Sequence, residues 1–284
     1  MSNNLAELTL SQRIEDILVA RNLRGMKTVQ THLKPGYCLR AAALLNNCKG
    51  NILIGTGFPV VDTFETDGPV GSIALYESLE ALGANPVIVC GRPISQALSG
   101  KYRVYEIRLG DHDQREQEAL DALEKYKPEA IVSIERPGQA ADGGYYNMRG
   151  ESISPRTACF DTFMNLCQCP TIGVGDGGNE IGMGNVGNAL KDLNIVPCTT
   201  TCDELIVADV SNWGAYGIIS FLSIWNERDL LKEINPLEIL KYISELGSVD
   251  GVTRINQLTE DGLAVTEGES VLLELRQACG FPTG

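Results

Sequence analysis

PTIGVGD, residues 170–176, is a short apolar run that ends in glycine and an acid. Similar runs recur along the chain, and such runs are typical of strands buried on both faces of a parallel sheet. The others are NILIGTG (51–57), NPVIVCG (85–91), YRVYEIRL (102–109), EAIVSIE (129–135) and ELIVADV (204–210). Segments with helical spacing lie between them, at 69–82, 114–126, 155–166, 213–225 and 236–246. This alternation predicts an α/β fold, doubly wound, with a mainly parallel sheet covered by helices on both faces.

The N-terminal part has a helical pattern of its own. Apolar residues at helical spacing predict a first helix whose apolar face docks on the main body, namely Leu8, Ile14, Ile17, Leu18 and Leu23. No linker-like tract divides the rest of the chain. The sequence therefore predicts a helical extension over residues 1–27 and one α/β domain over residues 28–284.

Composition narrows the class of protein. The formal net charge of −14 argues against nucleic acid or an anionic membrane as the main partner, because phosphate binding depends on clustered Lys and Arg. Nine cysteines occur without a CxxC pair, which favours reduced thiols over a zinc site. The start has no basic region followed by an apolar one, and no apolar run reaches the length of a membrane span. A soluble, cytoplasmic protein is expected, and assembly into a homo-oligomer stays open.

The loops after the strands point to a site at one edge of the sheet. Ligands of open parallel sheets bind beyond the carboxyl ends of the strands. The loops expected there are rich in acids and glycine, as in GTGFPVVDTFETDGP (55–69), ERPGQAADGGYYNMRG (135–150) and GDGGNEIGMG (175–184). The loops expected at the opposite edge, such as KYKPE and CQCP, are short and plain. This asymmetry predicts a functional cleft at the carboxyl edge.

The glycine-rich stretch TIGVGDGGNEIGMGNVG (171–187) holds seven glycines. Glycine lets the backbone approach a ligand closely, and a helix beginning near Asn179 or Glu180 would direct free N–H groups at an anion. A dinucleotide fingerprint is not matched, because GTGFPV after the first strand lacks the third glycine, and NAD is not expected. The alternative to an anion site is a tight turn between strand and helix, which would also need glycine.

Acidic residues in the same loops suggest a metal. Carboxylate oxygens suit Mg²⁺, Mn²⁺ or Ca²⁺, although each acid taken alone is more commonly a helix cap. The candidates at this edge are Asp62, Glu65, Asp67, Asp142, Asp176, Glu180 and Asp209. We expect a divalent cation, Mg²⁺ or Mn²⁺, with Asp176, Glu180 and Asp142 as its ligands.

Arginines and histidines limit the chemistry further. Three arginines, Arg136, Arg149 and Arg156, stand within 135–156 in a strongly acidic chain, and guanidinium grips a carboxylate at two points. The alternative to carboxylate binding is that these arginines form ordinary salt bridges on the surface. The two histidines, His32 and His112, lie outside the strand-end loops, so proton transfer is expected to rest on carboxylates.

Three long strings carry a family resemblance. ETDGPVGSIALYESLEALG (65–83), ERPGQAADGGYYNMRG (135–150) and TIGVGDGGNEIGMGNV (171–186) resemble the cyclase domain of the D-glutamate cyclase family, which is the C-terminal half of the larger members. The similarity runs from about Thr28 to about Cys279 in matching order. It implies a lyase that dehydrates D-glutamate to 5-oxo-D-proline, with a small anionic amino acid as substrate. We expect a protein that stands alone, without the additional N-terminal domain and the mitochondrial presequence of the larger members.

The implied chemistry assigns roles to the candidate residues. Asp67, Asp142 or Glu180 would take the ammonium proton of the substrate, and a divalent ion or Arg149 would hold its γ-carboxylate. Arg136 or Arg156 would hold the α-carboxylate. The remaining substrate-binding candidates are Gly175, Gly177, Gly178, Asn179 and Asn147.

Two other classes of function stay open at this point. One is a metal-dependent lyase or phosphotransfer enzyme that acts on another small carboxylic acid. The second is a non-catalytic protein that binds a small anionic metabolite.

Overall fold

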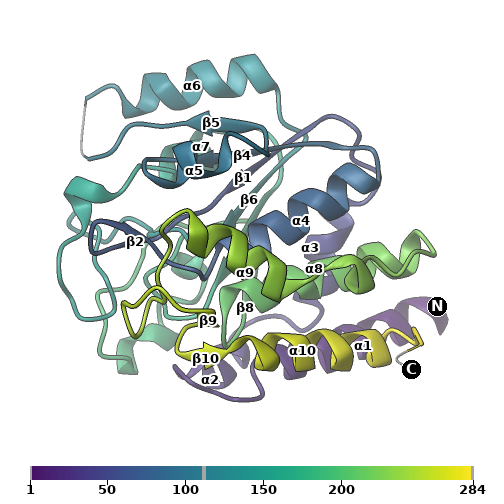
Figure 1. Ribbon diagram of the computed structural model, residues 1–284. Helices are drawn as coiled ribbons and strands as arrows, with labels where there is room; N and C mark the ends of the chain where they lie inside the picture. The colour runs from purple at the N-terminus through teal and green to yellow at the C-terminus, as the bar shows by residue number, and fades with distance from the viewer. Residues whose placement is uncertain (1, 111–112, 283–284) are drawn as a thin grey trace.

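The structure is a computed structural model that describes residues 2–110 and 113–282. Its centre is a parallel sheet, drawn in Figure 1 with helices above and below it. Within the described residues the sheet has six strands: β5 (Val104–Glu106), β4 (Asn85–Cys90), β1 (Asn51–Gly55), β6 (Ala130–Ile134), β7 (Thr171–Gly175) and β8 (Glu204–Val207), in that spatial order. Every neighbouring pair is parallel. The predicted doubly wound α/β fold is confirmed, and each of the apolar runs contains a strand.

Alternate residues of the central strands enter two different cores. Ile52 and Ile54 of β1 belong to the larger core, whereas Leu53 between them belongs to the smaller one. The larger core packs the sheet against α3 (Tyr37–Leu45), α4 (Pro69–Ala81) and α8 (Ser211–Trp225). The smaller core packs it against α6 (Arg115–Tyr126) and α7 (Asp161–Leu166). Burial on both faces explains why these strands are apolar throughout rather than alternating.

The other elements surround this frame. The remaining helices are α1 (Ser2–Leu18), α2 (Met26–Gln30), α5 (Ile94–Leu98), α9 (Pro236–Glu245) and α10 (Val265–Ala278). Two short hairpins, β2 (Pro59–Val60) with β3 (Thr63–Phe64) and β9 (Thr259–Glu260) with β10 (Leu263–Ala264), lie in loops. In residues 2–110 and 113–282, no helix is long and apolar enough to cross a bilayer.

The N-terminal helix joins the main body closely. Ile14, Leu18 and Val19 are fully buried in the larger core, and α1 runs beside α10 at the end of the molecule where both termini lie (Figure 1). The division at residue 27 stays a prediction, although α1 shares its core with the α/β domain. His112, one of the two histidines in the sequence, falls outside the described residues.

The helix expected near Asn179 is not formed. A 3₁₀ turn, Met183–Val186, stands there instead, and the N–H groups of Gly182 and Gly184 donate to the carbonyl of Thr200. At Gly184 a β-carbon would lie 2.3 Å from the carbonyl oxygen of Thr199, so the loop needs glycine in order to lie against the chain near residue 200. The segment 155–166 likewise forms only a 3₁₀ turn, Ser154–Arg156, before α7. An anion site at a helix N-terminus is therefore absent after β7, among the residues that the structure describes.

Candidate functional site: a buried acidic cluster at the switch point

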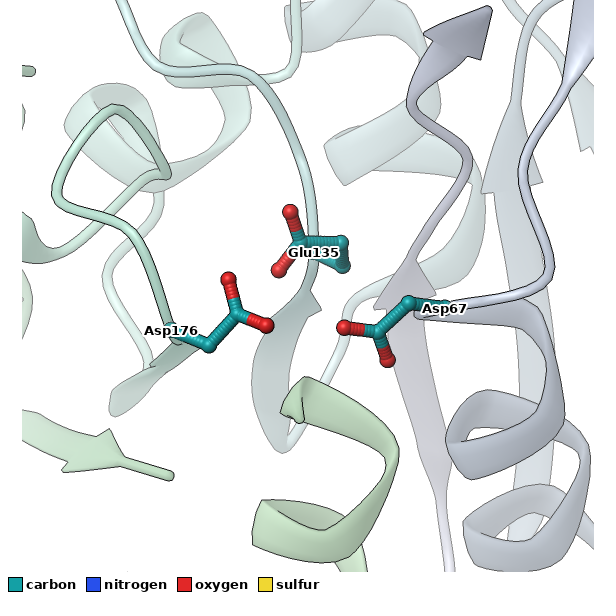
Figure 2. Close-up of side chains that lie close together, drawn as sticks. All are labelled: Asp67, Glu135 and Asp176. Carbon is teal, nitrogen blue, oxygen red and sulfur yellow. The ribbon is translucent and has the colours of Figure 1, made fainter. Parts of the chain in front are cut away.

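The site lies where the order of the strands reverses. Counted along the chain, the sheet strands follow the order third, second, first, fourth, fifth, sixth, so the switch point falls between β1 and β6. The loops after these two strands leave in opposite directions and open a crevice, which is where doubly wound proteins bind ligands. Figure 2 shows the carboxylates of Asp67, Glu135 and Asp176 pointing toward one another at this edge. One oxygen from each lies within 4.8 Å of the others, and each residue is at most 5% exposed.

Asp67 lies between the N-termini of α4 and α8, and hydrogen bonds hold it there. Its carboxylate accepts the backbone N–H groups of Ser211 and Asn212, at 2.9 and 2.8 Å, at the first residues of α8. In return, the side-chain oxygen of Asn212 accepts the N–H groups of Gly68 and Gly71, where α4 begins. Since free N–H groups at a helix start carry partial positive charge, these contacts favour the ionised form of Asp67.

Glu135 follows β6 directly in a backbone conformation that L-residues rarely adopt. Its φ is +48°, and its N–H donates to the carbonyl of Val174 on β7. The hydroxyl of Ser211 donates to one carboxylate oxygen at 2.5 Å. A non-glycine residue held in this region is uncommon and gathers at functional sites. The sequence pattern of β6 predicted the strand, but it gave Glu135 no role.

Asp176, the residue after β7, contacts a cation from the N-terminal segment. One guanidinium nitrogen of Arg24 lies 2.6 Å from Asp176 and 2.7 Å from Asp261, a residue of the turn between β9 and β10. Asp209 holds this segment in place, because it accepts the N–H groups of Arg21 and Leu23. The carboxylate oxygens of Asp176 are buried and accept no hydrogen bond within the described chain. Asp209, expected among the acids of the site, therefore acts by placing Arg24.

The electrostatics of the cluster are unusual for a protein interior. Burial raises the pKa of Asp67 to about 7 and that of Glu260 to about 8. Burial and neighbouring acids also raise the pKa values of Glu65, Glu135 and Asp176 well above their ordinary values. At Asp261 burial acts to raise the pKa, but the attraction of Arg24 and hydrogen bonds with its neighbours together outweigh burial and lower the pKa. Buried carboxylates repel one another, so the ionised cluster needs more positive charge than Arg24 supplies, either protons or a bound cation.

The chemistry of these donors fits a hard divalent cation. Mg²⁺ and Mn²⁺ prefer oxygen ligands, and Mg²⁺ commonly takes only one or two carboxylates together with water. Apart from the ion pair with Arg24, the carboxylate oxygens of Asp176 have no polar partner in the described chain, and Asp67 and Glu135 each place an oxygen nearby. Asp67, Glu135 and Asp176 are therefore the residues that would hold such an ion.

A cavity of about 400 Å³ opens above this cluster. Glu65, Glu135, Asp176, Asp261 and Arg24 line it from the cluster side. Arginines from the loops line it as well: Arg149, Arg156 and Arg254. Arg254 lies 3.3 Å from Glu151, whereas the described residues place no carboxylate within ion-pair distance of Arg149 or Arg156. The cavity thus combines buried acids with two unpaired guanidinium groups.

The predicted site residues divide into those near the cavity and those elsewhere. Asn147, Arg149, Arg156, Asp176 and Asn179 line it. Asn179 donates to the carbonyl of Tyr146 and leaves its buried side-chain oxygen without a partner. Asn147 instead folds onto its own turn, where it binds the N–H groups of Arg149 and Glu151.

Asp142 lies away from the cluster. It is exposed in a turn, and its carboxylate accepts the N–H of Gly144 and the hydroxyl of Tyr146. These contacts shape the turn 142–146, as an Asx turn does. The structure therefore does not bring Asp142 to the site as proton acceptor or metal ligand, and the loop position after β6 that faces the cluster is occupied by Glu135 instead.

Glu180 and the glycines form the support beneath Asp176. Glu180 is 1% exposed and accepts the N–H groups of Gly177 and Gly178 at 3.0 and 2.7 Å. Those N–H groups are consequently engaged within the loop. Gly175 has no room for a β-carbon, which would lie 2.8 Å from Glu180 and from Met183. The glycines allow the loop after β7 to fold tightly around Glu180.

Arg136 faces away from the cavity. Its guanidinium is buried and donates to the carbonyls of Thr56, Gly57 and Ala158. It joins the loops after β1 and before α7, so the structure places it as a connection between loops rather than beside the acidic cluster.

Two comparisons with known proteins bear on this arrangement. The chain matches the family described as D-glutamate cyclase-like, C-terminal, over residues 14–276. The human protein named D-glutamate cyclase, mitochondrial, is 30% identical over 249 residues, which cover 78% of this chain and 40% of that protein. The chain thus corresponds to less than half of its human relative.

A solved structure is similar only at a distance. The crystal structure of an exopolyphosphatase-related protein from Bacteroides fragilis has a TM-score of 0.46 and 12% identity, covering 88% of this chain and 58% of that one. This likeness is too remote to bear on function.

The fold and the site define a doubly wound α/β protein with an acidic crevice at its switch point. Its sequence places it further: the chain belongs to the D-glutamate cyclase-like family.

Proposed function

We propose that the protein is a lyase that converts D-glutamate to 5-oxo-D-proline and water in the cavity above the acidic cluster. One observation carries the proposal: a single cavity has buried carboxylates on one side and two unpaired arginines on the other. Glutamate has an ammonium group and two carboxylates, so it complements both sides. The name of the human relative and the family of the chain support the choice of reaction.

Binding rests on the arginines in this proposal. Arg149 and Arg156 hold the substrate carboxylates, because guanidinium binds a carboxylate through two parallel hydrogen bonds. Both line the cavity and neither has an acidic partner within ion-pair distance among the described residues. The ammonium group is then left to face Glu65 on the acidic side of the cavity. Fixing both ends of a flexible substrate brings its nitrogen toward the carbon of its γ-carboxylate, which lowers the entropic cost of ring closure.

Proton transfer rests on the buried acids. Ring closure removes two protons from the ammonium nitrogen and delivers two to the oxygen that leaves as water, so no net proton is consumed. Glu65, which lines the cavity but is not one of the metal ligands, takes a proton from nitrogen, because burial and neighbouring acids raise its pKa and make it a stronger base.

A divalent cation completes the proposal. Asp67, Glu135 and Asp176 would hold it, and it would supply positive charge for the oxyanion that develops on the γ-carboxylate. Arg24 stays beside Asp176 and Asp261 and limits the repulsion among the remaining acids.

The experiment that tests this function is a chiral product assay. Purified protein is incubated with D-glutamate or L-glutamate and with Mg²⁺ or Mn²⁺, and 5-oxoproline is separated by enantiomer and identified by the loss of water in mass. The proposal expects 5-oxo-D-proline from D-glutamate. Stabilisation of the fold by D-glutamate without turnover would instead indicate a metabolite-binding protein.

A further inference from the structure

Arg24 holds a cationic nitrogen between two buried carboxylates. Its Nη1 lies 2.6 Å from Oδ1 of Asp176 and 2.7 Å from Oδ2 of Asp261, and the side chains of these acids are 0% and 4% exposed. No other cation of the described chain lies within ion-pair distance of either acid. One guanidinium nitrogen therefore supplies the positive charge that both acids share.

Contacts outside the cluster hold Arg24 in this position. Asp209 accepts the N–H of Arg21 at 2.7 Å, three residues before Arg24. The guanidinium of Arg21 lies 4.7 Å from the centre of the Trp213 ring, and its Nε donates to Glu267 at 2.9 Å. The segment that carries Arg24 is thus anchored on the main body, so the guanidinium is a built part of the site rather than a mobile surface charge.

Asp176 faces a second cation position as well. One oxygen each from Asp67, Glu135 and Asp176 lies within 4.8 Å of the others, in the group that would hold the divalent cation (Figure 2). A carboxylate has two oxygens, so Asp176 can serve this position and Arg24 together. Two-metal sites place their ions about 3.5 to 4 Å apart. The cluster therefore has the arrangement of a two-cation site in which a guanidinium stands at one position.

We propose that Arg24 takes the place of a second divalent cation and so limits the acidic cluster to one bound ion. Arg24 lines the main cavity and its side chain is 20% exposed, so a smaller residue would leave space that water and ions can reach. Asp176 and Asp261 would then offer two carboxylates, the number that Mg²⁺ commonly takes together with water. The inference rests on the divalent site of the proposed function and adds the number of ions and the residue that sets it.

The guanidinium also changes the charge that the substrate meets. Arg24 adds one positive charge where a second ion would add two, and its charge cannot be removed near neutral pH. The cluster with one ion and Arg24 therefore keeps more negative charge to attract the ammonium group of the substrate than a cluster with two ions would.

Mn²⁺ counts the cation positions directly. The full chain, freed of metal, is titrated with Mn²⁺ by calorimetry, and the electron paramagnetic resonance spectrum of the bound ion is recorded, because two Mn²⁺ ions about 4 Å apart couple their spins. We expect one uncoupled Mn²⁺ per chain in the parent and two coupled ions in Arg24→Ala. Arg24→Lys keeps the charge and should bind one. The control is Arg40→Ala, which removes an arginine paired at 2.7 Å with Glu204, at the start of β8, and should also bind one.

A second neutral variant covers the case in which Arg24→Ala does not fold. Arg24→Gln keeps a donor for the acids but removes the charge, so it should bind Mn²⁺ at least tenfold more tightly than the parent. One Mn²⁺ per chain with an unchanged Kd in both neutral variants would overturn the proposal.

The same titrations separate this inference from the proposed function. Mn²⁺ binding by the neutral variants but not by the parent would overturn the metal of the proposed function and would keep Arg24 as the group that excludes an ion. No Mn²⁺ binding by any of these proteins would overturn both. A lack of turnover with D-glutamate would concern the proposed reaction only, since counting the ions needs no substrate.

Discussion

Asp67 and Asn212 cap each other's helices. The carboxylate of Asp67, just before α4, accepts the first N–H groups of α8, while the amide oxygen of Asn212, within α8, accepts N–H groups at the start of α4. The amide nitrogen of Asn212 donates at 2.7 Å to Glu260, whose pKa burial raises to about 8. The two helices approach closely here, since a β-carbon on Gly71 would lie 2.7 Å from the α-carbon of Asn212. One exchange of hydrogen bonds therefore holds both helices and orients Asp67 in the cluster.

Removing Asn212 should loosen this arrangement. Asn212→Ala deprives the N–H of Gly71 and the buried Glu260 of a partner, whereas Gly68 keeps its hydrogen bond to Asp67, so we expect a loss of about 2 to 4 kcal/mol in the free energy of unfolding. Turnover should fall as well, because the start of α8, whose backbone N–H groups hold Asp67, loses its side-chain link to the start of α4. Urea unfolding measures the first quantity. The control is Asn235→Ala, which removes an exposed cap of α9 and should cost about 1 kcal/mol with normal turnover.

Asp176→Asn should separate metal binding from folding. Asp176→Asn removes the ion pair of Asp176 with Arg24, but Arg24 keeps its ion pair with Asp261, and one source of repulsion among the buried acids disappears. We expect Mn²⁺ affinity, measured by calorimetric titration, to fall at least tenfold, while Tm in the presence of a chelator stays equal or rises. The control is Asp203→Asn at the opposite edge of the sheet, where Asp203 accepts hydrogen bonds from Thr171. It should lower Tm and leave Mn²⁺ affinity unchanged. Unchanged Mn²⁺ affinity in Asp176→Asn would remove this residue from the ligand set.

The metal-free protein should become less stable as pH rises. The folded-state pKa values of Asp67 and Glu260, about 7 and about 8, lie above those of the unfolded chain. The native state therefore binds more protons than the unfolded state between pH of about 4 and about 8, and stability falls with pH across this window. Asp261, with a lowered pKa, is ionised in both states there and adds no slope.

Metal should reverse that trend, because a divalent cation favours the ionised carboxylates. Scanning calorimetry across this pH window, with chelator and then with Mg²⁺ or Mn²⁺, measures both slopes. A Tm in chelator that climbs toward alkaline pH would mean that the acidic cluster is not protonated in the native state.

Arg149→Lys tests whether the geometry of guanidinium matters. Lysine keeps the charge but loses the planar pair of donors, so kcat/KM for D-glutamate should fall by about tenfold or more. Arg228→Lys provides the matched control, since Arg228 is a surface residue paired with Glu233. Kinetics of Arg149→Lys that equal those of Arg228→Lys would exclude Arg149 from substrate binding.

Much of the fold could be predicted from local pattern. Every apolar run contains a strand, because residues buried on both faces leave a continuous signal, and the parallel order follows from the intervening helices. The segment 155–166 and the glycine loop after β7 were predicted less well. Their backbones are set by contacts with distant residues such as Thr200, which no local pattern contains.

The candidate site shows the same division. Because they follow strands, Asp67 and Asp176 were correctly predicted to lie at the sheet edge. The same reasoning could not show that Glu135, rather than Asp142 in the same loop, would join the cluster. The positive φ of Glu135 and the local turn around Asp142 decide that difference. Arg24 and Asp261 come from segments far from the strands, and tertiary contacts alone bring them to the cluster. Among the cluster residues that were not predicted, Glu135 directly follows a predicted strand. That position was the one signal in the sequence that could have identified it.

The most direct test of the account is the metal dependence of D-glutamate turnover. Purified protein is freed of metal by exhaustive chelation, and formation of 5-oxo-D-proline is measured before and after Mg²⁺ or Mn²⁺ is restored, beside Asp176→Asn under the same conditions. The account predicts no product without metal, recovery on addition of either ion, and little recovery in Asp176→Asn. Full turnover by the chelated protein, or no product from D-glutamate under any of these conditions, would contradict it.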